Sequence, residues 1–395
     1  MENQLPANVL MVDSDKSLFQ QLSEHFEKMH IQLFSASDLE TAQYRFNKQF
    51  FKVVIIEQKF HDLDGLSIIQ RWRKHEVFDK RKASFILTTS DALDGKHQSL
   101  VSELGRIFVV PKPLSPMPLI SIVNKSYRAH LEYDMADQIK REILESIEKD
   151  NDPKAAVKRV MDKKNDLGDE YYPFLIELYE KFNQYGDAAE LLSKIPEKAM
   201  DPLRKLNMEG RILLKTGDNK GALKAFEKAD SLAPKNMERI ADMIDLYLQT
   251  SQPEKAVPKQ KELLNFHPDN PDMKFDLFKQ LEDNGFIEEA NAFCREVSAP
   301  KEVVRYFNNK GVALAKDNKV DTAISQYERA LRYFPKGEAN HLIHFNLALS
   351  HLKIGDEKAL DAALTHLEKS LEFKADYKKS LDLLEKLRQK QKKPA

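Results

Sequence analysis

Four polar residues that could do chemistry come directly after short apolar runs, where strands of a sheet would end. Asp13 follows LMV and Glu57 follows VVII, while Thr89 and Lys112 follow FILT and IFVVP. If these runs are parallel strands, their carboxyl ends meet at one edge of the sheet, where ligands bind. Carboxylates can hold a divalent cation, and an ammonium group can pair with an anion. The sequence therefore predicts one polar site at a sheet edge.

The elements that must position these residues lie in the first ~130 residues, which alternate apolar runs with amphipathic stretches. We expect strands at 9–12, 31–34, 53–56, 84–88 and 107–110, and helices at 16–29, 38–47, 65–75, 94–103 and from about 116 onward. The last three strands are continuous apolar runs, which are typical of strands covered on both faces. Strands and helices in strict alternation predict an α/β, doubly wound, five-stranded parallel sheet of the flavodoxin-like type.

The landmarks of this half resemble the response-regulator receiver family in order and spacing. They are MVDSD at 11–15, the strand that ends at 57, Asp64–Gly65, TTS at 88–90 and Lys112–Pro113. The resemblance implies an aspartate at the third strand end that accepts a phosphoryl group. It also implies two acidic residues that hold Mg²⁺, a hydroxyl group after the fourth strand and a lysine after the fifth.

The chain departs from the receiver pattern at two of these places. Position 57 is glutamate, and Ser14 stands beside Asp13 where the second acidic residue would be. Serine removes a charge that Mg²⁺ needs, and glutamate carries its carboxylate one methylene further out. A displacement of about 1 Å can cost roughly 100-fold in rate. We therefore expect a degenerate site that neither binds Mg²⁺ nor is phosphorylated at Glu57, with no other cofactor.

Two interpretations of the altered site stay open. The Glu57 carboxylate could reach toward Thr89 and Lys112 and mimic an active state, or it could form a purely structural ion pair with Lys112. Asp15 could replace the lost cation ligand, but its place before the first helix favours a helix N-cap. The aromatic residue that reports the switch in the family is here Val109, which weakens a phosphorylation relay further.

Beyond about residue 133 the strand pattern gives way to helices with an internal repeat. Alanines recur every 34 residues at Ala188, Ala222, Ala256 and Ala290. The series Gly210, Ala222, Phe226, Ala229 and Pro234 returns with the same spacing as Gly311, Ala323, Tyr327, Ala330 and Pro335. This pattern resembles the tetratricopeptide repeat (TPR) family. We expect Gly210 to pack against Ala222, and Gly311 against Ala323, because small residues let paired helices approach.

The resemblance implies an all-α superhelix whose concave face binds peptides or proteins. We expect its partner-binding residues on the first helix of each pair, at Arg204, Asn207, Arg211, Glu238, Arg305, Asn308, Asn309 and Asn346. Some family members grip a terminal carboxylate with such side chains. Arg305, Asn308 and Asn309 could do so here, although a solvated helix face gives the same pattern.

The organisation we expect is a receiver-like domain at 1–130, a helical linker or first repeat helix at 131–150, and repeats at 136–375. Six or seven repeats fit that range, and 376–395 reads as a capping helix with a basic tail. The helix that starts near Met117 has no strong breaker before Asp150. It either runs continuously or breaks near 133–135.

Composition excludes several classes of protein. The chain has 62 basic and 63 acidic residues, so nothing global attracts nucleic acid. Its single cysteine, Cys294, offers neither a disulfide nor a metal pattern, and no apolar run is long enough to cross a membrane. The groups His61–Asp64 and His341–His366 are weak metal signals that solvation or packing explains better. We expect a cytoplasmic protein without a bound metal.

No catalytic motif stands out, so the sequence predicts a protein that is not an enzyme. We interpret it as a bacterial signalling adaptor of the two-component type, with a protein partner on the concave face. A homodimer could form through the fourth helix, fifth strand and fifth helix of the receiver-like domain. One alternative is a phospho-regulated response regulator that uses Asp13, Asp15 and Lys112 in an altered geometry, and the other is an RNA-binding helical-repeat protein.

Overall fold

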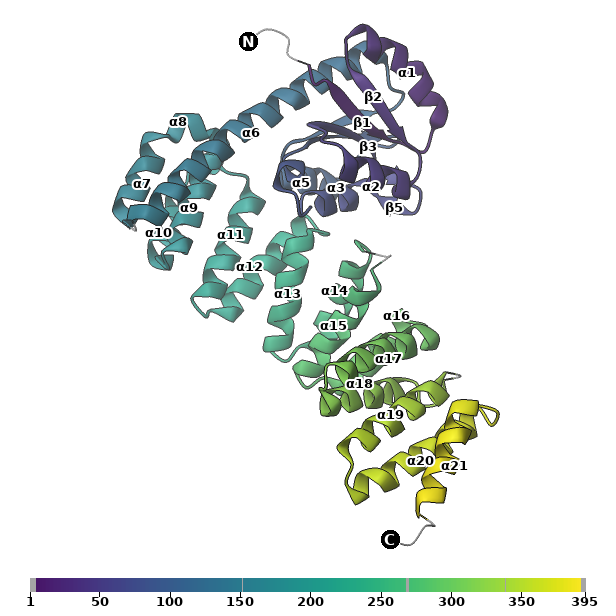
Figure 1. Cartoon of the computed structure of the whole chain (residues 1–395). Coiled ribbons are helices and arrows are strands. Elements are labelled where there is room, and N and C mark those ends of the chain that lie inside the picture. The colour runs from purple at the N-terminus through teal and green to yellow at the C-terminus, as the bar shows by residue number, and fades with distance from the viewer. Residues whose placement is uncertain (1–4, 151, 268–269, 338, 392–395) are drawn as a thin grey trace. The chain divides into compact units, whose positions relative to one another are not determined.

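The computed structural model describes residues 5–150, 152–267, 270–337 and 339–391. The chain divides into two compact units, Met1–His267 and Pro268–Ala395. The first unit joins an α/β domain to helices, and the second is wholly helical in its described residues (Figure 1). In the described part of the chain, no helix combines the length and the apolarity needed to cross a bilayer.

The first unit begins with the predicted parallel sheet. Its strands are β1 (Asn8–Val12), β2 (Gln32–Ala36), β3 (Val53–Glu57), β6 (Ser84–Thr89) and β7 (Ile107–Pro111), in the spatial order β2-β1-β3-β6-β7. All neighbouring strands in this sheet are parallel. The central strand β3 has no exposed area from Val53 to Ile56, because helices cover both faces. The predicted fold class is confirmed.

Two helical layers sandwich the sheet. One face packs against α1 (Lys16–Lys28) and the start of α6 (Pro116–Asp150), and the other against α2 (Leu39–Lys48), α3 (Gly65–Trp72) and α5 (Gly95–Leu104). The expectation of a fully buried fifth strand was wrong. Because β7 is the edge strand, its side chains are only partly covered and Val109 is 40% exposed.

A short hairpin that the sequence did not predict connects β3 to α3. It consists of β4 (Lys59–Phe60) and β5 (Leu63–Asp64). Asp64 then caps α3 by accepting a hydrogen bond from Leu66 N at 3.0 Å. A Cβ atom on Gly65 would lie 2.4 Å from the carbonyl oxygen of Glu57, so only glycine fits against the end of β3. A four-residue helix, α4 (Phe78–Arg81), precedes β6 and was also missed.

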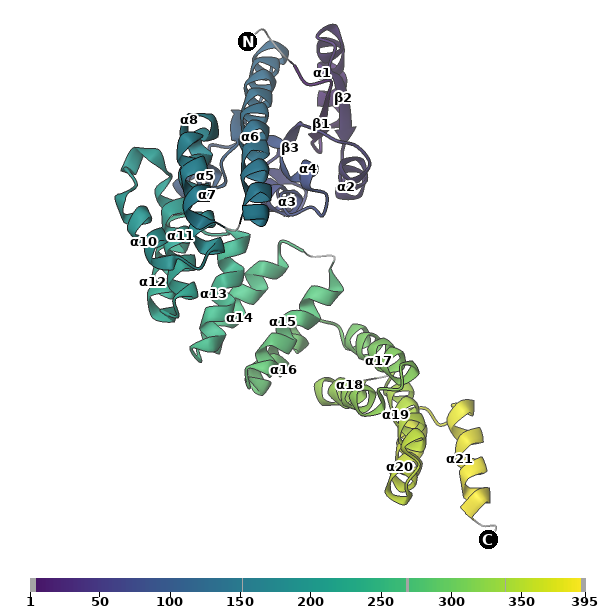
Figure 2. The ribbon, with the colours of Figure 1, turned by 60° about the vertical axis from the view of Figure 1, so that its left-hand side comes forward.

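Helix α6 runs unbroken for 35 residues out of the α/β domain and into the helical part, so the expected alternative of a break near 133–135 was wrong (Figure 2). Its middle is fixed to the sheet by the buried Lys82, whose Nζ lies 2.6 Å from Asp134 and 3.1 Å from Asp137. The Arg106 guanidinium stacks 3.6 Å from the centre of the Tyr133 ring. These contacts hold α6 straight across the predicted domain boundary.

The remaining helices of the first unit follow one another with short connections. They are α7 (Pro153–Asp162), α8 (Lys164–Leu167), α9 (Tyr171–Lys181), α10 (Tyr185–Lys194), α11 (Pro202–Lys215), α12 (Asn219–Leu232), α13 (Met237–Gln249) and α14 (Pro253–Leu264). A Cβ atom on Gly210 would come within 2.6 Å of the Phe226 ring. The close approach of α11 and α12 therefore brings Gly210 against that ring, and not against Ala222 as we expected.

The second unit continues the pattern of paired helices. Its helices are α15 (Pro271–Asp283), α16 (Ile287–Val297), α17 (Pro300–Lys316), α18 (Val320–Tyr333), α19 (Asn340–Ile354), α20 (Glu357–Phe373) and α21 (Lys378–Gln391). A Cβ on Gly311 would lie 2.4 Å from the Tyr327 ring, which repeats the Gly210 arrangement and again replaces the expected alanine contact. Leu384 of α21 packs into the apolar cluster of α19 and α20, as a capping helix should.

Candidate functional site

The four polar residues at the strand ends meet at one edge of the sheet, as predicted, but three of them form the site. Lys112 Nζ lies 2.5 Å from Glu57 Oε1 and 2.9 Å from Asp13 Oδ2. Asp13 is 5% exposed, and the Glu57 side chain is 12% exposed. One ammonium group therefore serves two carboxylates that are largely withdrawn from water.

Ser14 completes this cluster from the opposite side. Its backbone N donates to Glu57 Oε2 at 3.1 Å, and its hydroxyl donates to the same oxygen at 2.7 Å. Both oxygens of Glu57 are thus engaged, one by Lys112 and the other by Ser14. The two positions at which the sequence departs from the receiver pattern contact each other directly.

The electrostatics of the cluster follow from burial and the shared lysine. Burial raises the pKa of Asp13, and neighbouring Glu57 adds to the effect. Burial also works on Glu57, but the hydrogen bonds from Lys112 and Ser14 outweigh it and hold the pKa of Glu57 below its usual value. Burial opposes the charge of Lys112, yet its bonds to Glu57 and Asp13 raise its pKa. The contacts thus favour the charged forms of Glu57 and Lys112, whereas burial opposes the charge on Asp13.

Thr89 does not join the cluster, although we expected that Glu57 could reach it. The Thr89 hydroxyl lies 2.7 Å from Gln58 Oε1 and 2.5 Å from the carbonyl oxygen of Asp91. With these acceptors next to it on the neighbouring loop, the hydroxyl is turned away from Glu57. An active-state mimic that depends on contact between Glu57 and Thr89 is not what this structure contains.

The residues at this edge do not suit a magnesium ion. The Lys112 ammonium group stands beside both carboxylates, where a cation would have to lie, and the Ser14 hydroxyl donates to Glu57, although Asp13 Oδ2 is buried without a hydrogen-bond partner. Asp15 accepts from Ser17 N at 2.8 Å and from the Ser17 hydroxyl at 2.7 Å, which makes it the N-cap of α1. Across the described ranges of the chain, no cluster of three or more His, Cys, Asp or Glu is placed to hold a metal.

The predicted concave residues of α11 line a large open cavity in the first unit. Its volume is about 1440 Å³, and Arg204, Asn207 and Arg211 lie on its wall. Arg204 Nη2 pairs with Glu170 at 3.2 Å, and Glu238 of α13 pairs with Lys74 of the α/β domain at 3.4 Å. These side chains gather on one surface, as predicted, but they bind other parts of the same chain.

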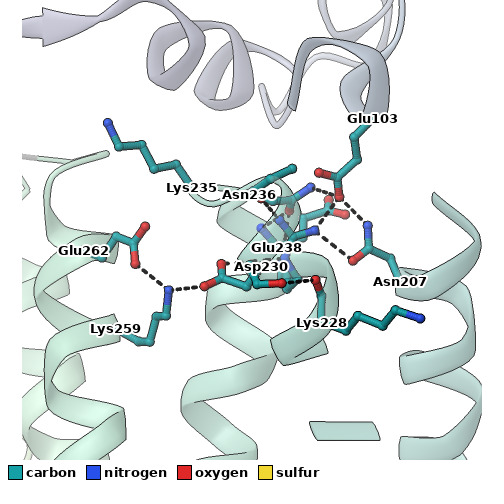
Figure 3. A network of polar contacts seen from close by, with 12 residues as sticks. Glu103, Asn207, Lys228, Asp230, Lys235, Asn236, Glu238, Lys259 and Glu262 are labelled. Carbon is teal, nitrogen blue, oxygen red and sulfur yellow. Dashed lines mark hydrogen bonds and ion pairs between the residues drawn. The ribbon is translucent and has the colours of Figure 1, made fainter. Parts of the chain in front are cut away.

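Asn207 shows this most clearly, because it belongs to a buried polar cluster around Glu103 of α5. One Glu103 oxygen accepts hydrogen bonds from Asn207 Nδ2, from Asn236 Nδ2 at 2.8 Å and from Arg239 Nη1 at 2.5 Å (Figure 3). The side chains of Glu103 and Arg239 are 3% and 1% exposed. The ion pair therefore lies fully inside the first unit and joins the α/β domain to the helices.

The predicted residues of the second unit are less engaged. Asn346 Nδ2 donates to Asn308 Oδ1 at 2.6 Å, so these two amides face each other across α19 and α17. Arg305 and Asn309 are exposed on α17. Asn308 uses its Oδ1 in the contact with Asn346 and not its Nδ2, the group that would donate to a carboxylate, so the clamp of Arg305, Asn308 and Asn309 stays a prediction.

Two kinds of comparison bear on this architecture. A family model described as "Tetratricopeptide repeat" matches residues 206–236, which include α12, part of α11 and the loop that follows α12. The chain carries a tetratricopeptide repeat. No curated protein sequence matches the chain.

We call the α/β domain the receiver-like domain, because the solved structures similar to it include response-regulator proteins. The chemotaxis response regulator CheY4 of Vibrio cholerae is 21% identical, and the match covers 30% of this chain and 98% of that chain with a TM-score of 0.28. A CheY-like receiver domain protein from Methanospirillum hungatei is 17% identical over 32% and 96% of the two chains, with a TM-score of 0.28. The Francisella response regulator 1452 receiver domain is 26% identical over 31% and 97%, with a TM-score of 0.26.

The residues that join the receiver-like domain to the repeat helices were missed at the sequence level. Glu103, Asn236 and Arg239 each fit an ordinary local role, since Glu103 lies in the last turn of a helix and Asn236 is the N-cap of α13. One available signal was Arg239, which stands one helical position after the predicted Glu238 on the first helix of a repeat. A fully buried arginine needs a carboxylate partner, but its partner lies 136 residues away.

Proposed function

We propose that this protein is a non-catalytic signalling adaptor, in which a phosphorylation-independent receiver-like domain is coupled to a TPR scaffold that binds another protein. The observation that carries the proposal is the closed state of Glu57. Its two carboxylate oxygens are held by Lys112 and Ser14 in the place where a phosphoryl acceptor would stand.

Phosphoryl transfer depends almost entirely on positioning and on electrostatic stabilisation of the transferred group. An acceptor carboxylate must offer a free oxygen in line with the donor, beside a metal ion that offsets the phosphate charge. Glu57 offers neither, because its oxygens are occupied and Lys112 neutralises the carboxylates that would hold the ion. This supports a domain that no longer takes part in phosphorylation.

The helical part supports the binding half of the proposal. Tetratricopeptide helices stack into a continuous surface whose first helices present side chains to a ligand. Arg305 and Asn309 on α17 are exposed and are suited to an acidic or amide-rich peptide segment. Such a protein partner, in the cytoplasm of a bacterium, is part of the proposal.

Homodimerisation through the receiver-like domain stays a prediction, and contacts within the first unit would compete with it. The face expected to dimerise includes α5, but Ser102 and Glu103 at the end of α5 contact Asp201 and Arg239 of the repeat helices. A second copy would have to displace these contacts or use the exposed edge of β7. Light scattering on the purified chain distinguishes monomer from dimer.

Labelling with radioactive acetyl phosphate in the presence of Mg²⁺ tests the phosphorylation-independent state. We expect no covalent label on the wild-type chain, and no change in Trp72 fluorescence on addition of beryllofluoride with Mg²⁺. The double substitution Ser14→Asp with Glu57→Asp restores the family's acidic residues and serves as the matched control. Label on wild-type Glu57 would overturn the proposal.

Affinity capture from the native cell tests the scaffold role. The full-length chain is used as bait beside a variant with Arg305→Glu and Asn309→Asp, which reverses the charge of the exposed face of α17. We expect a protein that the wild type retains and the variant loses. Equal recovery of the captured protein on both baits would show that the exposed face of α17 does not bind it.

A further inference from the structure

The end of α5 is seated on the repeat helices as a ligand would be. Leu100, Val101 and Leu104 of α5 belong to the same apolar cluster as Leu203 of α11 and Ala233 at the end of α12. α5 and α11 are in direct contact. This strip of apolar side chains on α5 covers the sheet of its own domain, since Val54, Phe85 and Leu87 belong to the same cluster, and α5 also touches α11 of the repeat helices.

At the edge of this apolar strip, Asn207, Asn236 and Arg239 form a three-donor socket, in which all three donate to one oxygen of the Glu103 carboxylate. Figure 3 shows Asn207 and Asn236 directed at Glu103. Arg239 is itself held in place, since Nη1 also donates to Asn207 Oδ1 at 3.0 Å and Nη2 donates to the carbonyl oxygen of Ala233. The donors are therefore oriented by the repeat helices. The carboxylate enters a site that other residues have built.

Two further contacts fix the direction of approach. The Gln70 side chain donates to the carbonyl oxygen of Lys235 at 2.9 Å and accepts from Met237 N at 2.8 Å. The Ser102 hydroxyl donates to Asp201 Oδ2 at 2.6 Å, at the start of α11. The receiver-like domain is thus recognised through both side chains and backbone of the loop that precedes α13.

The socket matches a single negative charge. Arg239 is its one cation among the three donors, and Asp230 Oδ1 lies 3.8 Å from Arg239 Nε. Lys259 is already used by Asp230, at 2.6 Å, and by Glu262, at 2.7 Å. Asp230 and Glu262 already offset the charges of Arg239 and Lys259, so the entering group adds negative charge in a buried place, where a singly charged carboxylate costs less than a doubly charged phosphate group.

The contact is also one that can be released. Glu103 Oε2 is buried and has no hydrogen-bond partner. A buried ion pair gains little net stability, because desolvation of both charges offsets their attraction. An external helix with an apolar strip and a glutamate replaces the contacts that α5 makes with the repeat helices, while the buried Leu100 of α5 stays packed in the core of its own domain.

We propose that the surface formed by α11, the end of α12 and α13 is a binding site for an amphipathic helix that presents a glutamate next to its apolar strip. Helix α5 of the receiver-like domain is its built-in occupant. A partner protein with such a helix displaces α5 and releases the receiver-like domain. This inference rests on the proposed scaffold function and names the chemistry of its partner.

The test uses the full-length chain and a fluorescein-labelled synthetic peptide of residues 94–106, which reproduces α5 with Glu103. The wild type should bind the peptide poorly because the site is filled. Glu103→Ala vacates the socket, so we expect at least tenfold tighter binding than to wild type. A peptide with glutamine at position 103 should bind this variant about tenfold more weakly, since a hydrogen bond to a charged group is stronger than one to a neutral group.

Asn207→Asp is the matched control. It also loses the bond to Glu103 and loosens α5, but its new carboxylate pairs with Arg239 and repels the peptide. We expect increased amide exchange in α5 for both variants, and peptide binding only for Glu103→Ala. If circular dichroism shows that the alanine variant is unfolded, Glu103→Gln replaces it; glutamine still fills the socket but binds it more weakly, so the glutamate peptide should compete better with this variant than with wild type.

Equal binding of the peptide to wild type and to the vacated variant would overturn the inference, and so would its failure to bind a folded variant whose α5 exchanges faster. Neither result touches the closed state of Glu57 or the exposed face of α17. Failure of this inference is therefore distinguishable from failure of the proposed function.

Discussion

Ser14 and Glu57 are joined by two hydrogen bonds, from the Ser14 backbone at 3.1 Å and from its hydroxyl at 2.7 Å, both to Glu57 Oε2. Because glutamate is one methylene longer than aspartate, its Oε2 comes within hydrogen-bond distance of the Ser14 hydroxyl. An aspartate at position 14 would instead place a third carboxylate beside Asp13 and Glu57, with Lys112 as the shared cation. Each of the two departures from the receiver pattern therefore fits better in the presence of the other than on its own.

A double-mutant cycle measures this relationship. Ser14→Ala removes one donor to Glu57, and Glu57→Gln removes the charge that strengthens the bond. Because Ser14 is exposed, we expect Ser14→Ala to cost about 1 kcal/mol or less, whereas Glu57→Gln should cost more because it also weakens the bond to Lys112; the coupling energy should be about 0.5–1 kcal/mol. Urea unfolding followed by the fluorescence of Trp72, the single tryptophan, reports the receiver-like core. Strict additivity of the two changes would show that the bonds are not coupled.

Replacement of the shared lysine should be far more costly. Lys112→Met keeps the length of the side chain but leaves Asp13 and Glu57 facing each other without a cation. Loss of one partner of a buried pair leaves an uncompensated charge, so we expect a loss of about 2–4 kcal/mol in the free energy of unfolding. Lys59→Met is the control, because Lys59 pairs with Asp91 on the surface at 74% and 69% exposure. We expect a much smaller loss there, because an exposed ion pair is screened by water.

The sign of the pH dependence separates a charge effect from a packing effect in Lys112→Met. Without the lysine, burial and mutual repulsion raise the pKa of both carboxyl groups in the folded state above their unfolded values. The folded state then binds more protons than the unfolded state as pH falls toward those values, so acid restores stability. We expect the penalty to shrink between pH 7 and pH 5. A penalty that is constant with pH would mean that packing is the cause.

The fold could be predicted because its signals are local. The run VVII at 53–56 is covered on both faces and alternates its side chains between two helical layers, as a continuous apolar run implies. The meeting of Asp13, Glu57 and Lys112 at one site could also be predicted, because the carboxyl ends of parallel strands lie at one edge of the sheet. Repeat spacing likewise predicted that Gly210 sits at a close helix contact, although its neighbour is the Phe226 ring.

The rest depends on contacts between distant segments that leave no local trace. The Thr89 hydroxyl is directed to the carbonyl oxygen of Asp91, two residues further on, and to Gln58, which lies 31 residues earlier in the chain, just before the β4–β5 hairpin that the strand pattern does not predict. Glu103 lies in the last turn of an amphipathic helix, where a carboxylate usually faces water. Its burial against Arg239 follows only from the docking of one domain on the other.

The glycines at the helix contacts offer a test of packing. Gly210→Ala would place its Cβ 2.6 Å from the Phe226 ring, which is 1% exposed and cannot move freely. Overpacking of this kind costs about 1–3 kcal/mol. Gly186→Ala is the control, because nothing lies within 4 Å of its added Cβ and alanine favours a helix by about 1 kcal/mol. Circular dichroism melts should show opposite shifts, and Phe226→Leu should recover part of the loss in Gly210→Ala.

The second unit contains a pair of buried histidines that should make its stability sensitive to acid. His344 Nδ1 lies 3.1 Å from His366 Nδ1, and His351 stacks on His366 with ring centres 5.5 Å apart. Burial lowers the pKa of His344 to about 4, with a smaller effect from Lys369. Burial also lowers the pKa of His366 to about 4, and His344, His351 and Lys369 add to it. Both rings are therefore neutral in the folded state at pH 7.

This pair should contribute stability above about pH 6.5, the ordinary pKa of histidine, and lose it as pH falls toward 4. The unfolded state takes up protons in that range while the folded state does not, so the free energy of unfolding falls with pH. Each unit of pKa difference corresponds to about 1.4 kcal/mol. We expect hydrogen exchange in α19 and α20 to accelerate between pH 6.5 and pH 4.5 in wild type, after correction for intrinsic rates. The double variant His344→Asn, His366→Asn should show much less of this change, whereas His30→Asn, at an exposed site where φ is 58°, should behave like wild type. A double variant as acid-sensitive as the parent would mean that other groups govern the stability of these helices.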